Sequence, residues 1–181
     1  DVTQEEYEFL ERKQFPCTYC YYNPLFLPEI HPNLFWDDDE LGGYLATRHL
    51  IDHGHQKILT IRADDSAMKM YESRTQGYLR AMRERGFTPN IVEIAMTWPA
   101  ARTLVQERLS FLKEFTAIFV QQDQPALSMM QELVYQNGIS IPDDLSIVGY
   151  NNIEMIHEIG MKLDSVADPM EQDIRSAVLA L

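Results

Sequence analysis

The chain has 181 residues, of which 45% are hydrophobic and 24% charged, so it can bury one sizeable core or form part of a larger two-lobed unit. Its 28 acidic and 15 basic residues give a net charge of −13, which repels phosphate backbones and anionic lipid. No run approaches the roughly 18 apolar residues of a membrane span, and no charged-then-apolar leader opens the chain. The composition excludes a membrane protein, argues against direct nucleic-acid contact by this segment, and predicts a soluble, cytoplasmic domain.

The first 41 residues differ in pattern from the rest. Residues 5–12 are typical of the end of a helix, residues 17–21 of a strand, and residues 22–33, with three prolines, of a long irregular loop. We expect residues 1–41 to be the remnant of an N-terminal lobe of something longer.

Cys17 and Cys20 have the CxxC spacing of many metal and redox sites. They lie in an extended run, where residues three apart point to opposite faces, and the chain has no second cysteine pair. We therefore expect cysteines of a core or strand and no zinc site.

From residue 42 onward, helical and strand patterns alternate. The predicted helices span residues 42–53, 67–85, 100–113 and 124–137, and the strands that follow them span residues 57–61, 91–95, 116–120 and 145–149. Such alternation predicts right-handed βαβ units and an α/β fold with one parallel sheet flanked by helices. Gly54 and the Asn137-Gly138 pair are expected to end the helices that precede them.

The tail contains one more predicted strand, residues 161–167, and a helix from Met170 to the end of the chain. We expect residues 42–160 to form a C-terminal lobe, and residues 161–181 to be a return segment to the N-terminal lobe.

His49 and His53 have the i,i+4 spacing of a helical metal pair. The His53-Gly-His55 sequence is more typical of a helix end with Gly54 in the left-handed conformation. We therefore predict no metal here.

Polar or aromatic side chains follow each of four predicted strands. They are Arg62 to Asp65, Met96 to Trp98, Gln121 to Asp123, and Tyr150 to Asn152. In a parallel sheet all four clusters lie at the carboxyl edge, where open α/β sheets bind ligands. An indole for a C–H face, with amides and carboxylates for hydroxyls, favours a sugar-like ligand.

Arg74 lies on the predicted helix of residues 67–85, with Tyr71 and Tyr78 on the same stripe facing the sheet. A buried guanidinium without a partner is costly, so Arg74 needs one. Two interpretations stand side by side: a structural pair with Asp64, Asp65 or Asp123, or charge-assisted hydrogen bonds to ligand oxygens.

The other candidates also have structural alternatives. Trp98 precedes a helix that begins at Pro99 and can cap the core instead of stacking on a ligand. Asp123 is as well placed for an N-cap as for a ligand contact. Gln122 has fewer local structural roles than Trp98 or Asp123, and Asn151 can be a plain turn residue.

These residues carry a resemblance to a known family. The segments are residues 42–55 (GGYLATRHLIDHGH), Arg74 with Gly77 and Tyr78, residues 116–123 (TAIFVQQD) and residues 141–150 (IPDDLSIVGY). They resemble the effector-binding domain of lactose/galactose-repressor-type (LacI/GalR) bacterial transcription regulators. Residues 62–65 and 35–43 are most similar to the arabinose-responsive, AraR-like branch, which joins a GntR-type winged-helix head to this domain.

The resemblance implies a periplasmic-binding-protein-like fold of two lobes, an effector in the cleft between them, and a homodimer. The residues it matches to family ligand positions are Arg74, Trp98, Gln122, Asp123, Asn151 and the acidic Asp38 before the crossover helix. Gln122 replaces an asparagine and Asn151 an aspartate. Because an amide donates as well as accepts, the ligand's hydroxyl pattern is expected to differ from the family's usual sugar.

We therefore predict a sensor domain for a small-molecule effector, such as the sugar L-arabinose, that controls DNA binding by a separate N-terminal head absent from this chain. The alternative is a transport-type periplasmic sugar-binding protein of the same fold. An enzyme is not favoured, because no nucleophile elbow, phosphate-cradling loop or metal set accompanies the available acids and His157. No cofactor is predicted.

Overall fold

The computed structural model describes residues 3–20, 34–35, 37–64, 69–158, 160–167 and 170–180. The chain divides into two compact units, one formed by residues 1–38 and 168–181 and the other by residues 39–167. The assignment of residues 1–41, 42–160 and 161–181 to lobes of a larger domain stays a prediction.

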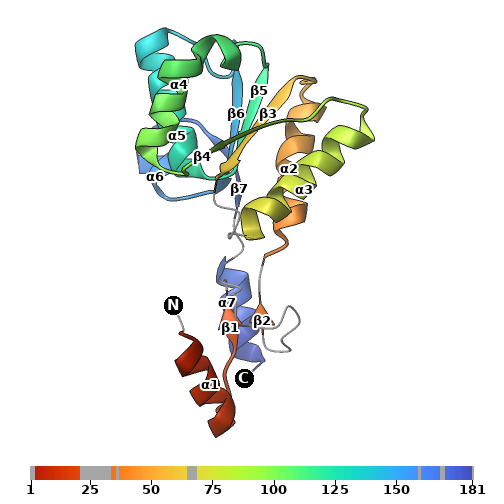
Figure 1. The fold of residues 1–181 in the computed structure, drawn as a ribbon, viewed down its shortest axis with the longest axis vertical. Coiled ribbons are helices and arrows are strands. Elements are labelled where there is room, and N and C mark those ends of the chain that lie inside the picture. The colour runs from red at the N-terminus through yellow and green to blue at the C-terminus, as the bar shows by residue number, and fades with distance from the viewer. Residues whose placement is uncertain are drawn as a thin grey trace. The chain divides into compact units, whose positions relative to one another are not determined.

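The larger unit is built on a five-stranded sheet in the order β4-β3-β5-β6-β7 (Figure 1). Its strands are β3 (Ile58–Ala63), β4 (Asn90–Ile94), β5 (Ala117–Val120), β6 (Ser146–Asn151) and β7 (Asp164–Ala167). Each neighbouring pair is parallel, so the predicted α/β fold with a parallel sheet is confirmed.

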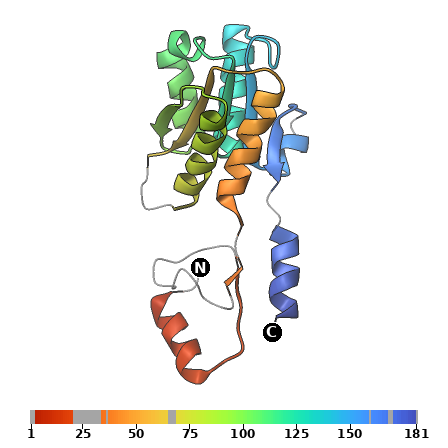
Figure 2. The ribbon, with the colours of Figure 1, turned by 90° about the vertical axis from the view of Figure 1, so that its right-hand side faces the viewer.

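Helices cover both faces of this sheet (Figure 1, Figure 2). One face carries α2 (Asp39–Asp52) and α3 (Lys69–Glu84), and the other carries α4 (Trp98–Leu112), α5 (Asp123–Gln131), the π-helical segment η1 (Glu132–Gln136) and α6 (Met155–Glu158). The four-residue α6 has no counterpart among the predicted elements, because so short a helix leaves no periodic pattern.

The two faces of the sheet build two hydrophobic clusters. Within β3, Leu59 and Ile61 point to the cluster under α4 and α5, while Ile58 points to the cluster under α2 and α3. The two-residue period of a strand thus sends successive side chains into separate cores. Because both faces are covered, strands such as β5 are apolar throughout rather than alternating.

The predicted helix ends are confirmed at Gly54 and Gly138, whose φ angles are +94° and +64°. Other boundaries shift. Helix α2 begins at Asp39 rather than residue 42, and β6 continues to Asn151 rather than ending at residue 149. The predicted helix over 124–137 is divided into α5 and η1, and α4 has a non-helical residue, Arg108, near its end.

The smaller unit contains α1 (Gln4–Lys13), the parallel pair β1 (Tyr19–Cys20) and β2 (Leu34–Phe35), and α7 (Met170–Leu179). Thr3 begins α1 with a capping box to Glu6. Cys17 is half-buried and forms no disulfide. The predicted loop of residues 22–33 lies outside the described residues, and within the described ones no helix is long and apolar enough to cross a membrane.

Candidate ligand-binding site

The carboxyl ends of the strands meet at one edge of the sheet, as the alternation predicts. The register pairs Ala63 with Ile94, Ile61 with Val120, and Phe119 with Val148. The polar residues that follow these strands therefore share that edge.

Arg74 lies buried on α3, with 3% of its surface exposed. Its Nε donates to Asp39 Oδ1 at 2.8 Å and one terminal nitrogen donates to the Gln121 carbonyl at 2.7 Å. Its guanidinium carbon lies 3.7 Å from the centre of the Tyr150 ring. Arg74 thus has the acidic partner that its burial demands, but that partner is Asp39, which sequence reasoning did not consider, and not Asp64 or Asp123. The third candidate, Asp65, lies outside the described residues.

Close packing of α2 on α3 places Asp39 beside Arg74. A Cβ added at Gly43 would lie 2.1 Å from the Arg74 carbonyl oxygen, and one at Gly77 would lie 2.0 Å from the Glu40 carbonyl oxygen. The two helix backbones therefore touch, and this approach brings the first turn of α2 to the middle of α3.

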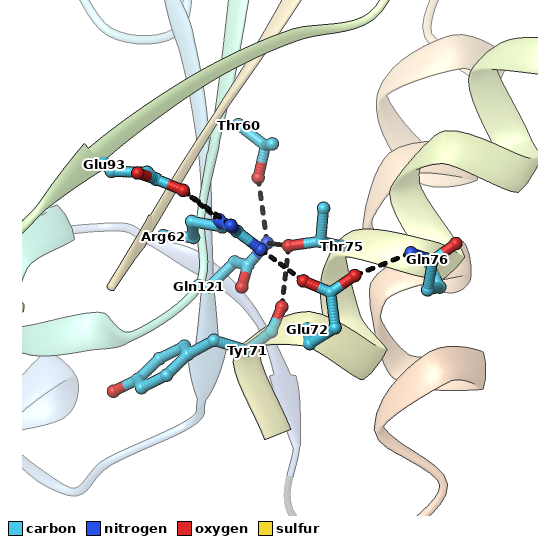
Figure 3. A network of polar contacts seen from close by, with 8 residues as sticks. All are labelled: Thr60, Arg62, Tyr71, Glu72, Thr75, Gln76, Glu93 and Gln121. Atoms are coloured by element: carbon cyan, nitrogen blue, oxygen red, sulfur yellow. Dashed lines mark hydrogen bonds and ion pairs between the residues drawn. The ribbon is translucent and has the colours of Figure 1, made fainter. Parts of the chain in front are cut away.

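Gln121 belongs to one of the predicted polar clusters, but the sequence did not single it out as a candidate site residue. It is fully buried, and its Nε2 donates to Thr60 Oγ1 at 3.2 Å and to Thr75 Oγ1 at 3.0 Å (Figure 3). Its Oε1 is buried and has no hydrogen-bond partner. Since Gln121 also binds Arg74 through its carbonyl, it joins β5 to α3 twice. The only sequence signal was its place directly after an apolar strand.

Arg62 forms a second polar network on the same face of the sheet (Figure 3). Its guanidinium binds Glu93 of β4 and Glu72 of α3, and Glu72 also accepts from Gln76. The hydrogen bonds from Gln76 and Arg62 lower the pKa of Glu72. Arg62, part of the AraR-like motif, is thus engaged by the protein's own acids.

Gln122 is half-buried at the N-cap position of α5, but its side chain makes no capping hydrogen bond. Its Oε1 accepts from the Tyr71 hydroxyl at 3.3 Å. The Nε2 of this amide has no partner among the described residues, so it can donate to a ligand.

Asp123 is fully buried as the first residue of α5. One carboxylate oxygen accepts from Ser165 Oγ at 2.7 Å and the other from the Ile153 amide at 2.9 Å. Burial raises the pKa of this carboxyl, and the hydrogen bonds from Ile153, Ser165 and neighbouring amides oppose the rise. Both carboxylate oxygens of Asp123 therefore accept hydrogen bonds from groups of the protein itself.

Asn151 ends β6 with a φ of +100°, and Asn152 follows with a φ of +51°. The Asn151 Oδ1 atom is buried and has no hydrogen-bond partner. An unpaired buried acceptor costs about 1–3 kcal/mol, so this atom is a candidate to receive a ligand donor.

Trp98 and Asp38 lie in different surroundings. Trp98 is the first residue of α4, half-buried and packed against the cluster under α4 and α5, and its carbonyl accepts from Ser128. The core-cap interpretation is therefore realised. Asp38 is exposed directly before α2. A contact of either residue with a ligand stays a prediction.

His49 and His53, the predicted helical pair, contact other groups of the protein. His49 Nε2 lies 3.2 Å from Asp164 Oδ2, and His53 Nδ1 lies 2.8 Å from the His49 carbonyl oxygen. Among the residues that the structure describes, no group of three or more metal-ligating side chains comes together.

A family model described as a periplasmic binding protein-like domain matches residues 47–181. The chain therefore belongs to the family of periplasmic binding protein-like domains.

Several proteins that the chain resembles are transcription regulators. The chain is 34% identical over 173 residues to the HTH-type transcriptional repressor PurR of Vibrio cholerae, a match covering 93% of this chain and 50% of the repressor. A LacI-family regulator from Enterococcus faecium with bound ribose shares 26% identity at a TM-score of 0.79, over 99% of this chain and 66% of that one. The cellobiose complex of the regulator CelR shares 25% identity at a TM-score of 0.76, over 97% and 54%.

The chain spans about half the length of the repressors it matches. The predicted periplasmic-binding-protein-like fold is confirmed, and the LacI-family regulators among the similar structures agree with the predicted resemblance. The named relatives are a transcriptional repressor and transcriptional regulators, in line with the expectation of a non-enzymatic domain. The AraR-like branch and its GntR-type head gain no support from these relatives.

Proposed function

We propose that this chain is the effector-sensing domain of a transcriptional repressor, and that the carboxyl edge of its larger sheet binds a small polar molecule. The named relatives are regulators, which favours a sensor over a transport-type binding protein. As the family resemblance implies, we also propose that the ligand lies between the two lobes of the complete effector domain.

The buried, unpaired Oδ1 atom of Asn151 is the observation that carries the proposal. A ligand hydroxyl or N–H that donates to it would recover a hydrogen bond that the protein alone leaves unmade. Orphaned polar atoms of this kind are uncommon in folded proteins, and this one lies where parallel sheets bind ligands.

Donors are available at the same edge. Gln122 Nε2 is unpaired among the described residues, and Arg74 has more N–H groups than its two hydrogen bonds use. A ligand group that both donates and accepts fits this set, and a sugar hydroxyl does both.

The charge of the edge favours an uncharged ligand. Asp39 already neutralises Arg74, and Asp123 accepts only from protein donors. A charged effector would have to displace one of these interactions. The displaced group would then be a buried charge without a partner, which is costly.

A sugar is our first candidate for the effector. The Enterococcus faecium regulator contains ribose and CelR contains cellobiose. L-arabinose stays in the proposal through the AraR-like motif of the sequence, and the name PurR suggests a purine-type effector as the second candidate. A purine would use the same donors and acceptor with a flat ring edge.

In the whole protein, which we propose to be a homodimer, a separate head contacts DNA. Effector binding to this domain changes the affinity of that head for DNA. By linkage, an effector that weakens DNA binding must itself bind more weakly to the DNA-bound protein, with a coupling of about 1–3 kcal/mol. This domain alone, at a net charge of −13, is a poor partner for DNA.

Calorimetric titration of the intact protein with ribose, L-arabinose, cellobiose, adenine and guanine tests the proposal. We expect one of the compounds to bind, and Asn151→Ala to weaken that binding about tenfold or more. Tyr78→Phe is the matched control. It removes a buried hydroxyl of α3 that donates to the Ile58 carbonyl at the start of β3, so this variant should bind as the unchanged protein does. If Asn151→Ala and the control bind the compound equally well, the assignment of the site is wrong.

A further inference from the structure

We propose that Asp123 is a positioning residue of the effector site: its carboxylate holds the chain at residues 151–153 in the conformation that presents the Asn151 side chain, and it does not touch the effector. This inference rests on the proposed function, since it concerns the same site. It replaces a direct ligand role for Asp123.

The surroundings of Asp123 leave it no access to a ligand. The residue has no exposed surface, and its two carboxylate oxygens accept from the Ile153 amide and from Ser165 Oγ. A Cβ added at Gly149 would lie 2.1 Å from Oδ1, so the carboxylate packs directly on the backbone of β6. Asp123 is thus enclosed by α5, β6 and β7.

The conformation that Asp123 holds is an unfavourable one. Asn151 and Asn152 have φ angles of +100° and +51°, and two successive left-handed residues are rare outside glycine. Such a backbone persists only where its surroundings over-determine it.

Hydrogen bonds to two consecutive amides of the turn supply that restraint. The Asn152 amide donates to Ser165 Oγ at 3.0 Å, and Ser165 Oγ donates to Asp123 Oδ1. The next amide, Ile153, donates to Oδ2 of the same carboxylate. One buried group therefore fixes two consecutive amides that follow Asn151.

This restraint orients the Asn151 side chain at the carboxyl edge of the sheet. Asn151 is the residue whose Oδ1 is buried and unpaired, and its direction is set by the backbone that Asp123 holds. A turn that relaxed would let this oxygen reach solvent, and a ligand would then have to order it again at an entropic cost.

Asp123→Asn is the informative variant, because it keeps the shape of the side chain but leaves one acceptor in place of two. An amide nitrogen would face either the Ile153 amide or the Ser165 hydroxyl. Ser165→Ala removes one arm of the restraint and Ser165→Thr retains the hydroxyl. Tyr78→Phe, which also removes a buried hydrogen bond, controls for general destabilisation.

A double-mutant cycle in the intact protein tests the role, titrated with whichever of ribose, L-arabinose, cellobiose, adenine and guanine the unchanged protein binds. We expect Asp123→Asn and Asn151→Ala each to weaken binding about tenfold or more. In the Asn151→Ala background, Asp123→Asn should add less than about twofold, because the two changes remove the same contact. Ser165→Ala should weaken binding and Ser165→Thr should restore it.

Two results would overturn the inference while leaving the site assignment intact: unchanged binding by a folded Asp123→Asn, or fully additive losses in the cycle. Hydrogen exchange gives a readout without ligand. The Asn152 and Ile153 amides should exchange faster in Asp123→Asn than in Tyr78→Phe, and equal rates would contradict the positioning role. Failure of every compound to bind the unchanged protein would refute the proposed function instead.

Discussion

At the scale of single residues, Arg74 is packed and paired inside the protein and is also a proposed contact of the effector. Its helix stripe predicts burial and a partner, and both are present. The guanidinium joins α2, β5 and the Tyr150 ring, so an effector would meet an arginine that is already held in place. Such pre-organisation reduces the ordering cost that a ligand would otherwise meet.

Asp39→Ala should destabilise the fold, because it leaves the buried Arg74 without its anion. We expect the free energy of unfolding to fall by about 1–3 kcal/mol, measured by urea denaturation followed by circular dichroism. Asp52→Ala on the same helix is the matched control. Asp52 is 55% exposed in its pair with Arg48, so its removal should cost less than about 1 kcal/mol. Equal losses would show that the Arg74 pair is no more than a surface contact.

Asp123 should impose a pH dependence on stability that Asp123→Asn lacks. Burial raises the pKa of the folded carboxyl above its ordinary value of 3.8, so the folded state binds this proton more tightly than the unfolded state. The stabilisation is fully present below the unfolded pKa and is lost as the pH rises through the folded one. The aspartate protein should therefore lose stability relative to the asparagine variant across that interval, as urea titrations at a series of pH values would reveal. A difference that is constant with pH would contradict the raised pKa.

At the scale of elements, the contact of α2 with α3 is set by glycines. The position of Gly77 leaves no room for a methyl group beside the Glu40 carbonyl. This close approach places the first turn of α2 against the middle of α3, and thereby positions Asp39 for Arg74.

Gly77→Ala should separate the two helices and lower the free energy of unfolding by about 1–3 kcal/mol through overpacking, although alanine favours helix more than glycine does. Arg83→Ala, on an exposed position of the same helix, should change stability by less than about 0.5 kcal/mol. Thermal or urea unfolding measures both. A Gly77→Ala protein as stable as the original would mean that the helices yield without cost.

The periodic elements were predictable from the sequence, and their partners were not. Strand β5 is a short apolar run between two helical patterns, which is enough to place it in a parallel sheet. The Asp39 partner of Arg74 depends on how α2 packs on α3, which a single sequence does not encode locally. Gln121 and Gln122 are identical neighbours, and only the strand geometry decides that the first is buried and the second faces the edge.

The polar turn after β6 was predictable as a turn but not as a strained one. Asn151 and Asn152 are residues that tolerate positive φ, yet nothing in their order indicates the buried carboxylate that holds them. Asp123 at the start of a helix has the pattern of an N-cap or ligand contact, and the structure instead turns it toward β6 and β7. Long-range hydrogen bonds of this kind lie beyond a local pattern.

At the scale of the whole molecule, the fold gathers chemistry that is dispersed along the sequence. Arg74, Gln122 and Asn151 are far apart in the chain, and the parallel sheet brings the segments that carry them to one edge. We propose this edge as the effector site of a domain whose relatives include transcriptional repressors.

A crystal structure of the intact protein with its sugar or purine bound tests the central claim most directly. The account predicts a ligand donor within hydrogen-bond distance, about 2.5–3.2 Å, of Asn151 Oδ1, with Asp123 still bound to Ser165 and Ile153. A ligand seated away from the carboxyl edge of the sheet, with Asn151 Oδ1 still unpaired, would contradict it.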